Sequence, residues 1–276
     1  MSASRDAWRV EPDAGDAAAY AALASDRLWA GYSIADLEPP FRAYTRVALA
    51  RLGNEAAPAA ACLFLRHPAF NSTIPHGDPA GVAAILAATA HLPAATYLLA
   101  RDEHRPVLER HYDAAPAGWQ EMRRMAVDAG TFRPPERPTP AVARLGPGDL
   151  AALRDLLAEY PDNAFNADQL ASGVFYGARA DGALVAAGGT HVLAARHGIA
   201  AVGNVYTRPA WRGRGYATAI TAAVTAALLA GPCRDVILNV AAENGVARRL
   251  YARLGYREHC RYWEAAARQR AMSDER

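Results

Sequence analysis

The sequence predicts an α/β protein built from two similar halves, and three observations support this prediction. Runs typical of strands are interspersed with alanine-rich runs whose apolar residues recur at helical spacing. The order strand, strand, helix, strand, helix, strand is expected twice, over 44–127 and again over 183–263, at an offset of roughly 140 residues. A proline-rich stretch at 133–140 lies between the two and predicts a stiff extended linker.

The first half is expected to contain strands and helices whose bounds follow from apolar spacing and turn residues. Asp78-Pro79 is a strong helix start, because aspartate caps helices and proline suits the first helical position. The expected elements, in order, are a strand near Trp8 and Val10, a helix over 13–30, strands over 44–51 and 59–66, a loop over 67–77, a helix over 78–90, a strand over 95–101, a helix over 102–112 and a strand over 119–127.

The second half shows the clearer turn signals. Asp181-Gly182 is a typical hairpin dipeptide, Gly231-Pro232 stops a helix, and Gly255 suits a helix C-terminus. The expected elements are a strand over 141–145, helices over 148–159 and 166–172, strands over 174–179, 183–195 and 199–207, a helix over 216–230, a strand over 235–241, a helix over 245–254 and a strand over 257–263.

A glycine loop joins the strand at 199–207 to the helix at 216–230. It turns at Pro209 and passes through Gly213 and Gly215 directly into the helix. The first N–H groups of a helix have no intrahelical partner and carry partial positive charge, so we expect an anion site there, with Arg212 and Arg214 as nearby donors. The stretch fits neither the Walker nor the Rossmann pattern.

The same loop resembles the acyl-CoA loop of the GCN5-related N-acetyltransferases (GNAT family). The family pattern Gln/Arg-x-x-Gly-x-Gly/Ala is met by Arg212, Gly215 and Ala217, and a second motif follows with Asn244, Ala247, Tyr251, Gly255 and Tyr256. The resemblance covers residues 141–266 and implies the acyl-CoA N-acyltransferase fold, with a mixed, mostly antiparallel central sheet flanked by helices. With the repeated order of elements, we expect two tandem GNAT-like halves.

The resemblance also implies the roles of individual residues. Tyr251 takes the position of the general acid that protonates the departing thiolate, and a phenol with an ordinary pKa of about 10 suits that task. The cofactor-binding residues implied are Val205, Tyr206 and Thr207 for the pantetheine arm, Arg212, Gly213, Arg214, Gly215, Tyr216, Ala217 and Thr218 for the pyrophosphate, and Asn244 for the pantetheine amides.

Several of these residues have a second interpretation. Tyr251 also falls on the apolar stripe of its helix, and Asn244 also suits a helix N-cap. Arg248 and Arg249 are expected on a solvated face, with the 3′-phosphate of CoA as the alternative. The general base stays open among Glu243, His191 and Tyr206, and acceptor contacts are expected around 160–172, where Pro161-Asp162 and Asp168 are equally ordinary turn and cap residues.

The resemblance implies an activity and a division of the chain. We expect an N-acetyltransferase that moves the acetyl group of acetyl-CoA to a primary amine of a small molecule or peptide, directly in a ternary complex. The alternatives are a longer acyl group, a hydroxyl acceptor, or a non-catalytic acyl-CoA-binding module. The expected domains are a GNAT-like half without a CoA loop at 1–132, the linker at 133–140, the catalytic domain at 141–266 and a polar tail at 267–276.

Composition bears on the expected ligands, the location of the protein and the use of its cysteines. The net charge of +2 is too mild to predict nucleic-acid binding. No apolar run approaches the roughly 18 residues of a membrane span and no signal peptide is evident, so a cytoplasmic protein without membrane contact is expected. The three scattered cysteines predict neither disulfides nor a metal site. All 30 basic residues are arginines. A monomer or a homodimer is expected.

Overall fold

The chain divides into two compact units. The computed structural model describes residues 7–90, 92–160 and 163–270. Unit 1 comprises residues 1–123 and 260–276, and unit 2 comprises residues 124–259. The proline-rich stretch 133–140 is irregular and belongs to unit 2. The division into domains at that stretch stays a prediction.

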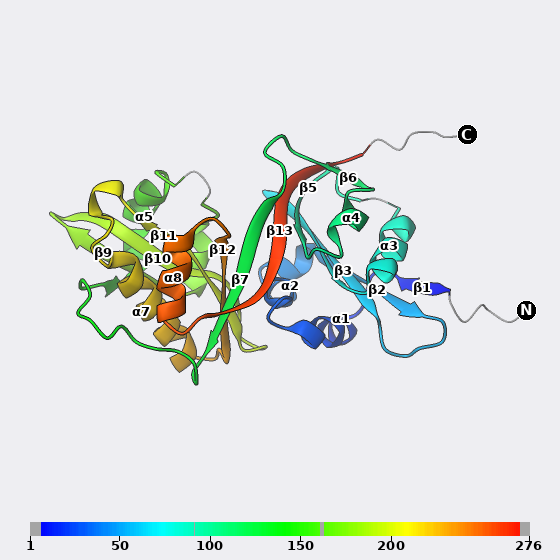
Figure 1. Cartoon of the computed structure of the whole chain (residues 1–276), viewed down its shortest axis with the longest axis horizontal. Coiled ribbons are helices and arrows are strands. Elements are labelled where there is room, and N and C mark those ends of the chain that lie inside the picture. The colour runs from blue at the N-terminus through cyan, green and yellow to red at the C-terminus, as the bar shows by residue number, and fades with distance from the viewer. Residues whose placement is uncertain (1–6, 91, 161–162, 271–276) are drawn as a thin grey trace, which may run out of the picture. The chain divides into compact units, whose positions relative to one another are not determined.

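Unit 1 is a sheet accompanied by the helices α1 to α4 (Figure 1). The strands run in the order β1-β2-β3-β4-β5-β13, with β6 beside β13. All of these pairs are antiparallel except β4–β5, which is parallel. The elements are β1 (Trp8–Glu11), α1 (Asp16–Leu23), α2 (Gly31–Ala35), β2 (Thr45–Leu52), β3 (Ala60–His67), β4 (Phe70–Gly77), α3 (Pro79–Ala88), β5 (Ala95–Ala100), α4 (Arg105–Leu108), β6 (Tyr112–Ala114) and the later part of β13 (Arg257–Gln269).

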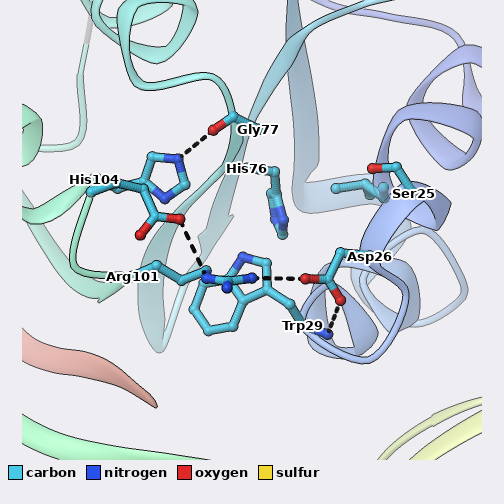
Figure 2. A pocket seen from close by; sticks show the side chains of 9 residues that line it. Ser25, Asp26, Trp29, His76, Gly77, Arg101 and His104 are labelled. Carbon is cyan, nitrogen blue, oxygen red and sulfur yellow. Dashed lines mark hydrogen bonds and ion pairs between the residues drawn. The ribbon is translucent and has the colours of Figure 1, made fainter. Parts of the chain in front are cut away.

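The expected loop over 67–77 is wrong, because most of it is β4. Polar residues and Pro75 made this stretch look like a loop, yet Thr73 is fully buried within the sheet. The parallel pairing of β4 with β5 covers only Ser72–Tyr97 and Thr73–Leu98. Pro75 follows two residues after Thr73, and it has no N–H to offer a ladder. The ends of the two strands therefore lie apart, beside a cavity (Figure 2).

Unit 2 repeats this design. Its strands run in the order β7-β12-β11-β10-β9-β8, and β11 and β12 are parallel. The elements are β7 (Gln120–Asp128), β8 (Ala143–Arg144), α5 (Leu150–Leu157), α6 (Ala167–Ser172), β9 (Phe175–Ala180), β10 (Ala183–Ala194), β11 (Ile199–Thr207), α7 (Tyr216–Ala230), β12 (Asp235–Ala241) and α8 (Gly245–Arg253). The last strand, β13, continues to Gln269 and so takes in the first residues of the segment expected as a polar tail.

The predicted repeat is present, but its elements correspond differently from the prediction. With β4 recognised, the series β2-β3-β4-α3-β5-α4-β7 corresponds to β9-β10-β11-α7-β12-α8-β13. The order expected from the sequence instead pairs β2 and β3 with β10 and β11, one strand too late. The last strand of each half of the sequence pairs with the strands of the other half. The strand β7 lies next to β12, and β13 lies next to β5.

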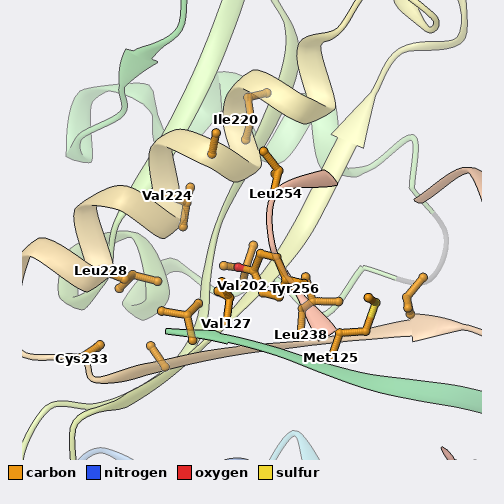
Figure 3. Close-up of a cluster of buried hydrophobic side chains, with 14 of the residues drawn as sticks. Met125, Val127, Val202, Ile220, Val224, Leu228, Cys233, Leu238, Leu254 and Tyr256 are labelled. Carbon is orange, nitrogen blue, oxygen red and sulfur yellow. The ribbon is translucent and has the colours of Figure 1, made fainter. Parts of the chain in front are cut away.

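The core of unit 2 positions the site. Ile220, Val224 and Leu228 form the buried stripe of α7, as their spacing predicts, and they pack with Val202 of β11 and Leu238 of β12 (Figure 3). Each such side chain contributes roughly 1.5–3 kcal/mol on burial. The helix that follows the glycine loop is therefore fixed against the two parallel strands.

Close backbone contact fixes the end of α8. Gly255 has φ +92°, and a Cβ there would lie 1.9 Å from the carbonyl oxygen of Thr131. Only glycine fits this turn. Its predicted place at the C-terminus of the helix is confirmed, because α8 ends at Arg253.

Candidate functional site

The site begins where β11 leaves β12. The parallel register covers only Ile199–Val202 of β11, paired with Asp235–Leu238 of β12. The register between β10 and β11 shifts just beyond, between Ala187 and Gly189, and Asn204 there has φ +53°. Such a bulge bends a strand and ends its pairing. The backbone of the last β11 residues is therefore turned away from the ladder with β12.

The glycine loop follows this opening. After a 3₁₀ turn at Pro209–Trp211, Gly213 and Gly215 have φ values of +75° and +88°, which side chains other than glycine rarely adopt. Apart from its chain neighbours, no described atom lies within 4 Å of a Cβ placed at Gly213. The loop is thus open on the side where a side chain would stand.

The N-terminus of α7 completes the loop. Gly215 is the N-cap residue, and no side chain of the described residues caps this helix. The first-turn N–H groups, which include those of Tyr216, Ala217 and Thr218, have no carbonyl partner within a helix. Together with the helix dipole they form a site suited to phosphate.

Both arginines of the loop lie against aromatic rings. The Arg212 guanidinium carbon lies 5.8 Å from the Tyr206 ring, and its Nε donates to the Thr207 carbonyl at 3.1 Å. The Arg214 guanidinium carbon lies 4.8 Å from the Trp211 ring. Their positive charge is therefore held beside the glycines.

Tyr251 lies on α8, partly buried against the core of unit 2. Its ring centroid is 5.9 Å from that of Tyr256. Burial, with a smaller contribution from Tyr160, raises the pKa of Tyr251 to about 12. The phenol keeps its proton throughout the physiological range, but it is a weaker acid than the ordinary value assumed from the sequence.

Tyr206 is unsuited to act as a free base. Its ring stacks on Tyr160 with centroids 5.6 Å apart and an interplanar angle of 8°. The side chain is 9% exposed and belongs to the cluster of α5 and α6 residues. We interpret it as a wall of the site on that side of β11.

Asn244 caps α8, as one of its two interpretations predicts. Its side-chain oxygen accepts from the Ala247 N–H at 3.1 Å. Arg248 donates to the Ala242 carbonyl at 3.2 Å and lies 3.3 Å from Glu258. Binding of pantetheine by Asn244, or of the 3′-phosphate by Arg248 or Arg249, stays a prediction.

The candidate bases differ in environment. Burial lowers the pKa of His191 to about 4, so this imidazole is neutral at pH 7 and a poor proton acceptor. Glu243 is exposed just before α8. The strand β11 itself carries no carboxylate.

Sequence reasoning missed a link between α6 and the bulge of β11. Asn204 donates to the side-chain oxygen of Gln169 at 3.2 Å, and Gln169 donates to the backbone carbonyl of His191 at 2.9 Å. Gln169 also closes a capping box with Asn166. An asparagine inside an apolar strand was the one available signal for it.

The expected acceptor segment is only partly described. Asp168 is exposed in the first turn of α6, whereas Pro161-Asp162 lies outside the described residues. Arg208, which follows β11, pairs at 3.0 Å with Glu159, the residue that precedes this segment.

Metal and membrane sites have no structural support in the described ranges. No group of three or more His, Cys, Asp or Glu residues there could hold a metal ion. The three cysteines are all buried and free. No helix among the described residues is both long enough and apolar enough to span a bilayer.

Comparison with known families identifies the domain around this site. Residues 148–256 match the model of the acetyltransferase (GNAT) family. That range includes the glycine loop, Asn244 and Tyr251. No curated protein matches the chain.

Solved structures extend the likeness to the whole chain. A GNAT-family protein from Novosphingobium aromaticivorans is 21% identical with a TM-score of 0.56, over 89% of this chain and 97% of its own. One from Sphaerobacter thermophilus is 18% identical with a TM-score of 0.58, over 98% and 97%. A tandem GNAT protein from the clavulanic acid biosynthesis pathway is 15% identical with a TM-score of 0.59, over 97% and 100%. The chain therefore has the tandem GNAT fold.

Proposed function

We propose that this chain, whose residues 148–256 form a domain of the acetyltransferase (GNAT) family, transfers the acetyl group of acetyl-CoA to a primary amine. Membership of that family supports acyl transfer from an acyl-CoA. The proposal goes further than this. It holds that the acyl group is acetyl, that the acceptor is an amine, that transfer is direct in a ternary complex, and that the protein is cytoplasmic.

One observation carries the proposal. An opened strand end leads through two glycines in the left-handed region to a helix N-terminus that no described side chain caps. Free backbone donors in this arrangement suit a pyrophosphate, and the parted strands leave room for an extended arm beside β11. The nearby Arg212 and Arg214 add positive charge.

The proposed roles of the residues follow. The N–H groups of 213–218 hold the pyrophosphate together with the Arg212 side chain, because the Arg212 N–H already donates to the Pro209 carbonyl. The backbone of 205–207 holds the pantetheine arm and polarises the thioester carbonyl. Tyr251 donates a proton to the departing thiolate. The raised pKa of Tyr251, about 12, makes that donation uphill towards a thiol of ordinary pKa near 8.5, so the phenol acts as the thiolate forms and not as an acid that ionises freely.

A non-catalytic acyl-CoA-binding module is the alternative that a specific observation favours. The strand β11 carries no carboxylate, and burial weakens His191 as a base. An enzyme would then need an amine that arrives neutral, or a water that relays its proton. Thiol release from acetyl-CoA with a panel of amines separates the two functions. Because the chain has no lysine, its own side chains add no amine background.

The first experiment tests the anion site by calorimetric titration of acetyl-CoA. The variant Gly215→Asp puts a carboxylate at the N-cap of α7, where it competes for the free N–H groups and repels phosphate. At an effective dielectric constant of 20, two charges 4 Å apart interact by about 4 kcal/mol, so we expect a loss of affinity of at least about 100-fold.

The matched control is Gly215→Asn. Asparagine has nearly the shape of aspartate, carries no charge and tolerates the left-handed region, so its loss of affinity should be much smaller. Equal binding by Gly215→Asp and the intact protein would place acetyl-CoA elsewhere. No binding by the intact protein would exclude both the enzyme and the binding module.

A further inference from the structure

Unit 1 contains a cavity at the parted ends of its own parallel strands. Its volume is about 190 Å³. His76 and Gly77 end β4, Arg101 follows β5, and α4 begins just after His104. The end of α1 and the segment after it supply Leu23, Ser25, Asp26 and Trp29 (Figure 2). Glu103 also lines the cavity.

This cavity occupies the place in unit 1 that the acyl-CoA opening occupies in unit 2. The strands β4 and β5 correspond to β11 and β12, and in each pair the parallel register stops partway. In unit 1, however, Asp78 follows β4 at once and its carboxylate accepts from the N–H groups of Ala80 and Gly81, at 2.7 and 3.2 Å. The helix N-terminus there is already occupied by an anion of the protein itself.

His104 provides an unused acceptor in this cavity. The side chain is 1% exposed, and its Nε2 lies 2.8 Å from the carbonyl oxygen of Gly77. A carbonyl can only accept, so Nε2 carries the hydrogen and Nδ1 carries the lone pair. Among the described residues this buried Nδ1 has no hydrogen-bond partner. A buried acceptor of this kind costs free energy unless a donor fills the space beside it.

The charges of the lining also favour a donor. The guanidinium of Arg101 lies 2.8 Å from Asp26 and 3.4 Å from Glu103, so two carboxylates face one cation. Burial lowers the pKa of His104, which keeps this ring neutral at pH 7. Leu23 and Trp29 offer an apolar wall to a short carbon chain.

We propose that this cavity is a binding site for a small compound that bears a protonated primary amine, which donates to His104 Nδ1 beside Asp26 and Glu103. The volume is below the roughly 300 Å³ of a typical drug-sized site, which excludes an acyl-CoA. The site belongs to unit 1 alone and does not depend on catalysis in unit 2.

The test uses three probes of matched carbon chain on the full-length protein: propylamine, 1-propanol and propionate. Binding is followed at pH 7.5 through the imidazole ¹⁵N resonances of His104. Propylamine should shift the Nδ1 resonance, and the other two should not. In His104→Gln, whose amide can still donate to the Gly77 carbonyl, the affinity for propylamine by calorimetry should fall about tenfold or more.

His111→Gln is the matched control, because His111 lies in unit 1 outside the lining. It should bind propylamine as the intact protein does. Asp26→Asn should weaken binding as well, and it gives a second result if His104→Gln does not fold. Unchanged affinity in both cavity variants would overturn the proposal, as would a cavity that prefers propionate or responds to no probe. The same titration with Gly215→Asp should be unaffected, which separates this site from failure of the proposed function.

Discussion

The two units differ at the helix N-terminus that follows the first strand of their parallel pair. In each, a strand leaves its parallel neighbour and leads towards a helix N-terminus. Unit 1 caps that helix with Asp78, directly after the strand, whereas unit 2 inserts a glycine loop and leaves α7 without a side-chain cap among the described residues. A cap satisfies the helix from within, and its absence leaves donors for a ligand.

This difference explains how one fold can carry two ligand chemistries. The parted strands are common to both units, but the residues that face the opening are not. Uncapped N–H groups and two arginines favour an anion in unit 2. Two carboxylates and a neutral histidine favour a cation in unit 1. The fold supplies the opening, and the residues at the strand ends decide what enters it.

The largest expected effect tests whether catalysis belongs to unit 2 alone. Replacing Tyr251 with phenylalanine removes the proposed acid and leaves the packing of the ring in place. Turnover, measured as thiol release with an amine that the intact protein acetylates, should fall about 10²- to 10⁴-fold with little change in acetyl-CoA affinity.

Tyr256→Phe is the control for this prediction. Tyr256 lies beside Tyr251, but its hydroxyl is 2.7 Å from the Thr225 hydroxyl in the core. Its loss should cost about 1 kcal/mol of stability and leave turnover nearly unchanged. If Tyr251→Phe kept its turnover, the general acid would have to lie on another element. The proposal that catalysis belongs to unit 2 would then lack its catalytic residue.

Unit 2 was the easier unit to predict from the sequence. The bounds of α7 and the glycines of the loop followed from strong local signals, namely helical spacing and two glycines between a strand and a helix. In β4 of unit 1, by contrast, buried Thr73 and His76 replace the apolar residues that would reveal a strand. Their partners come from distant positions, as with Thr96, whose hydroxyl lies 3.1 Å from that of Thr73.

Neither the cavity of unit 1 nor the bulge of β11 could be predicted from a local pattern in the sequence. The cavity lining comes from separate segments, near Asp26, His76 and Arg101, and no spacing along the chain connects them. The bulge at Asn204 depends on pairing with β10. Both are tertiary features, so local pattern and propensity could not predict them.

A smaller effect should appear in acid, where the half-buried His191 takes up a proton. Its pKa of about 4 lies below the ordinary 6.5, so the folded state favours the neutral ring. The unfolded chain takes up the proton first as the pH falls. The stabilisation is therefore complete above pH 6.5 and lost between 6.5 and 4, by about 2 to 3 kcal/mol. Urea unfolding at pH 7 and pH 4.5 measures it.

His191→Gln should remove that part of the acid sensitivity, because glutamine does not titrate. The Gln169 contact is to the backbone carbonyl of residue 191, so it survives the change. His259→Gln alters an exposed histidine of the same unit and should leave the slope with pH as it is. Identical slopes in all three proteins would mean that the surroundings of His191 do not lower its pKa.

The smallest effect concerns the cap that distinguishes unit 1. Asp78→Ala removes the acceptor for two N–H groups of α3 and should lower the free energy of unfolding by about 1 kcal/mol, whereas Asp78→Ser should retain most of it. Neither change supplies a glycine loop, so the calorimetric stoichiometry for acetyl-CoA should stay at one. A second acetyl-CoA bound by Asp78→Ala would mean that the carboxylate alone keeps the anion out of unit 1, and that the parted strands of both units accept the same ligand once a helix N-terminus is free.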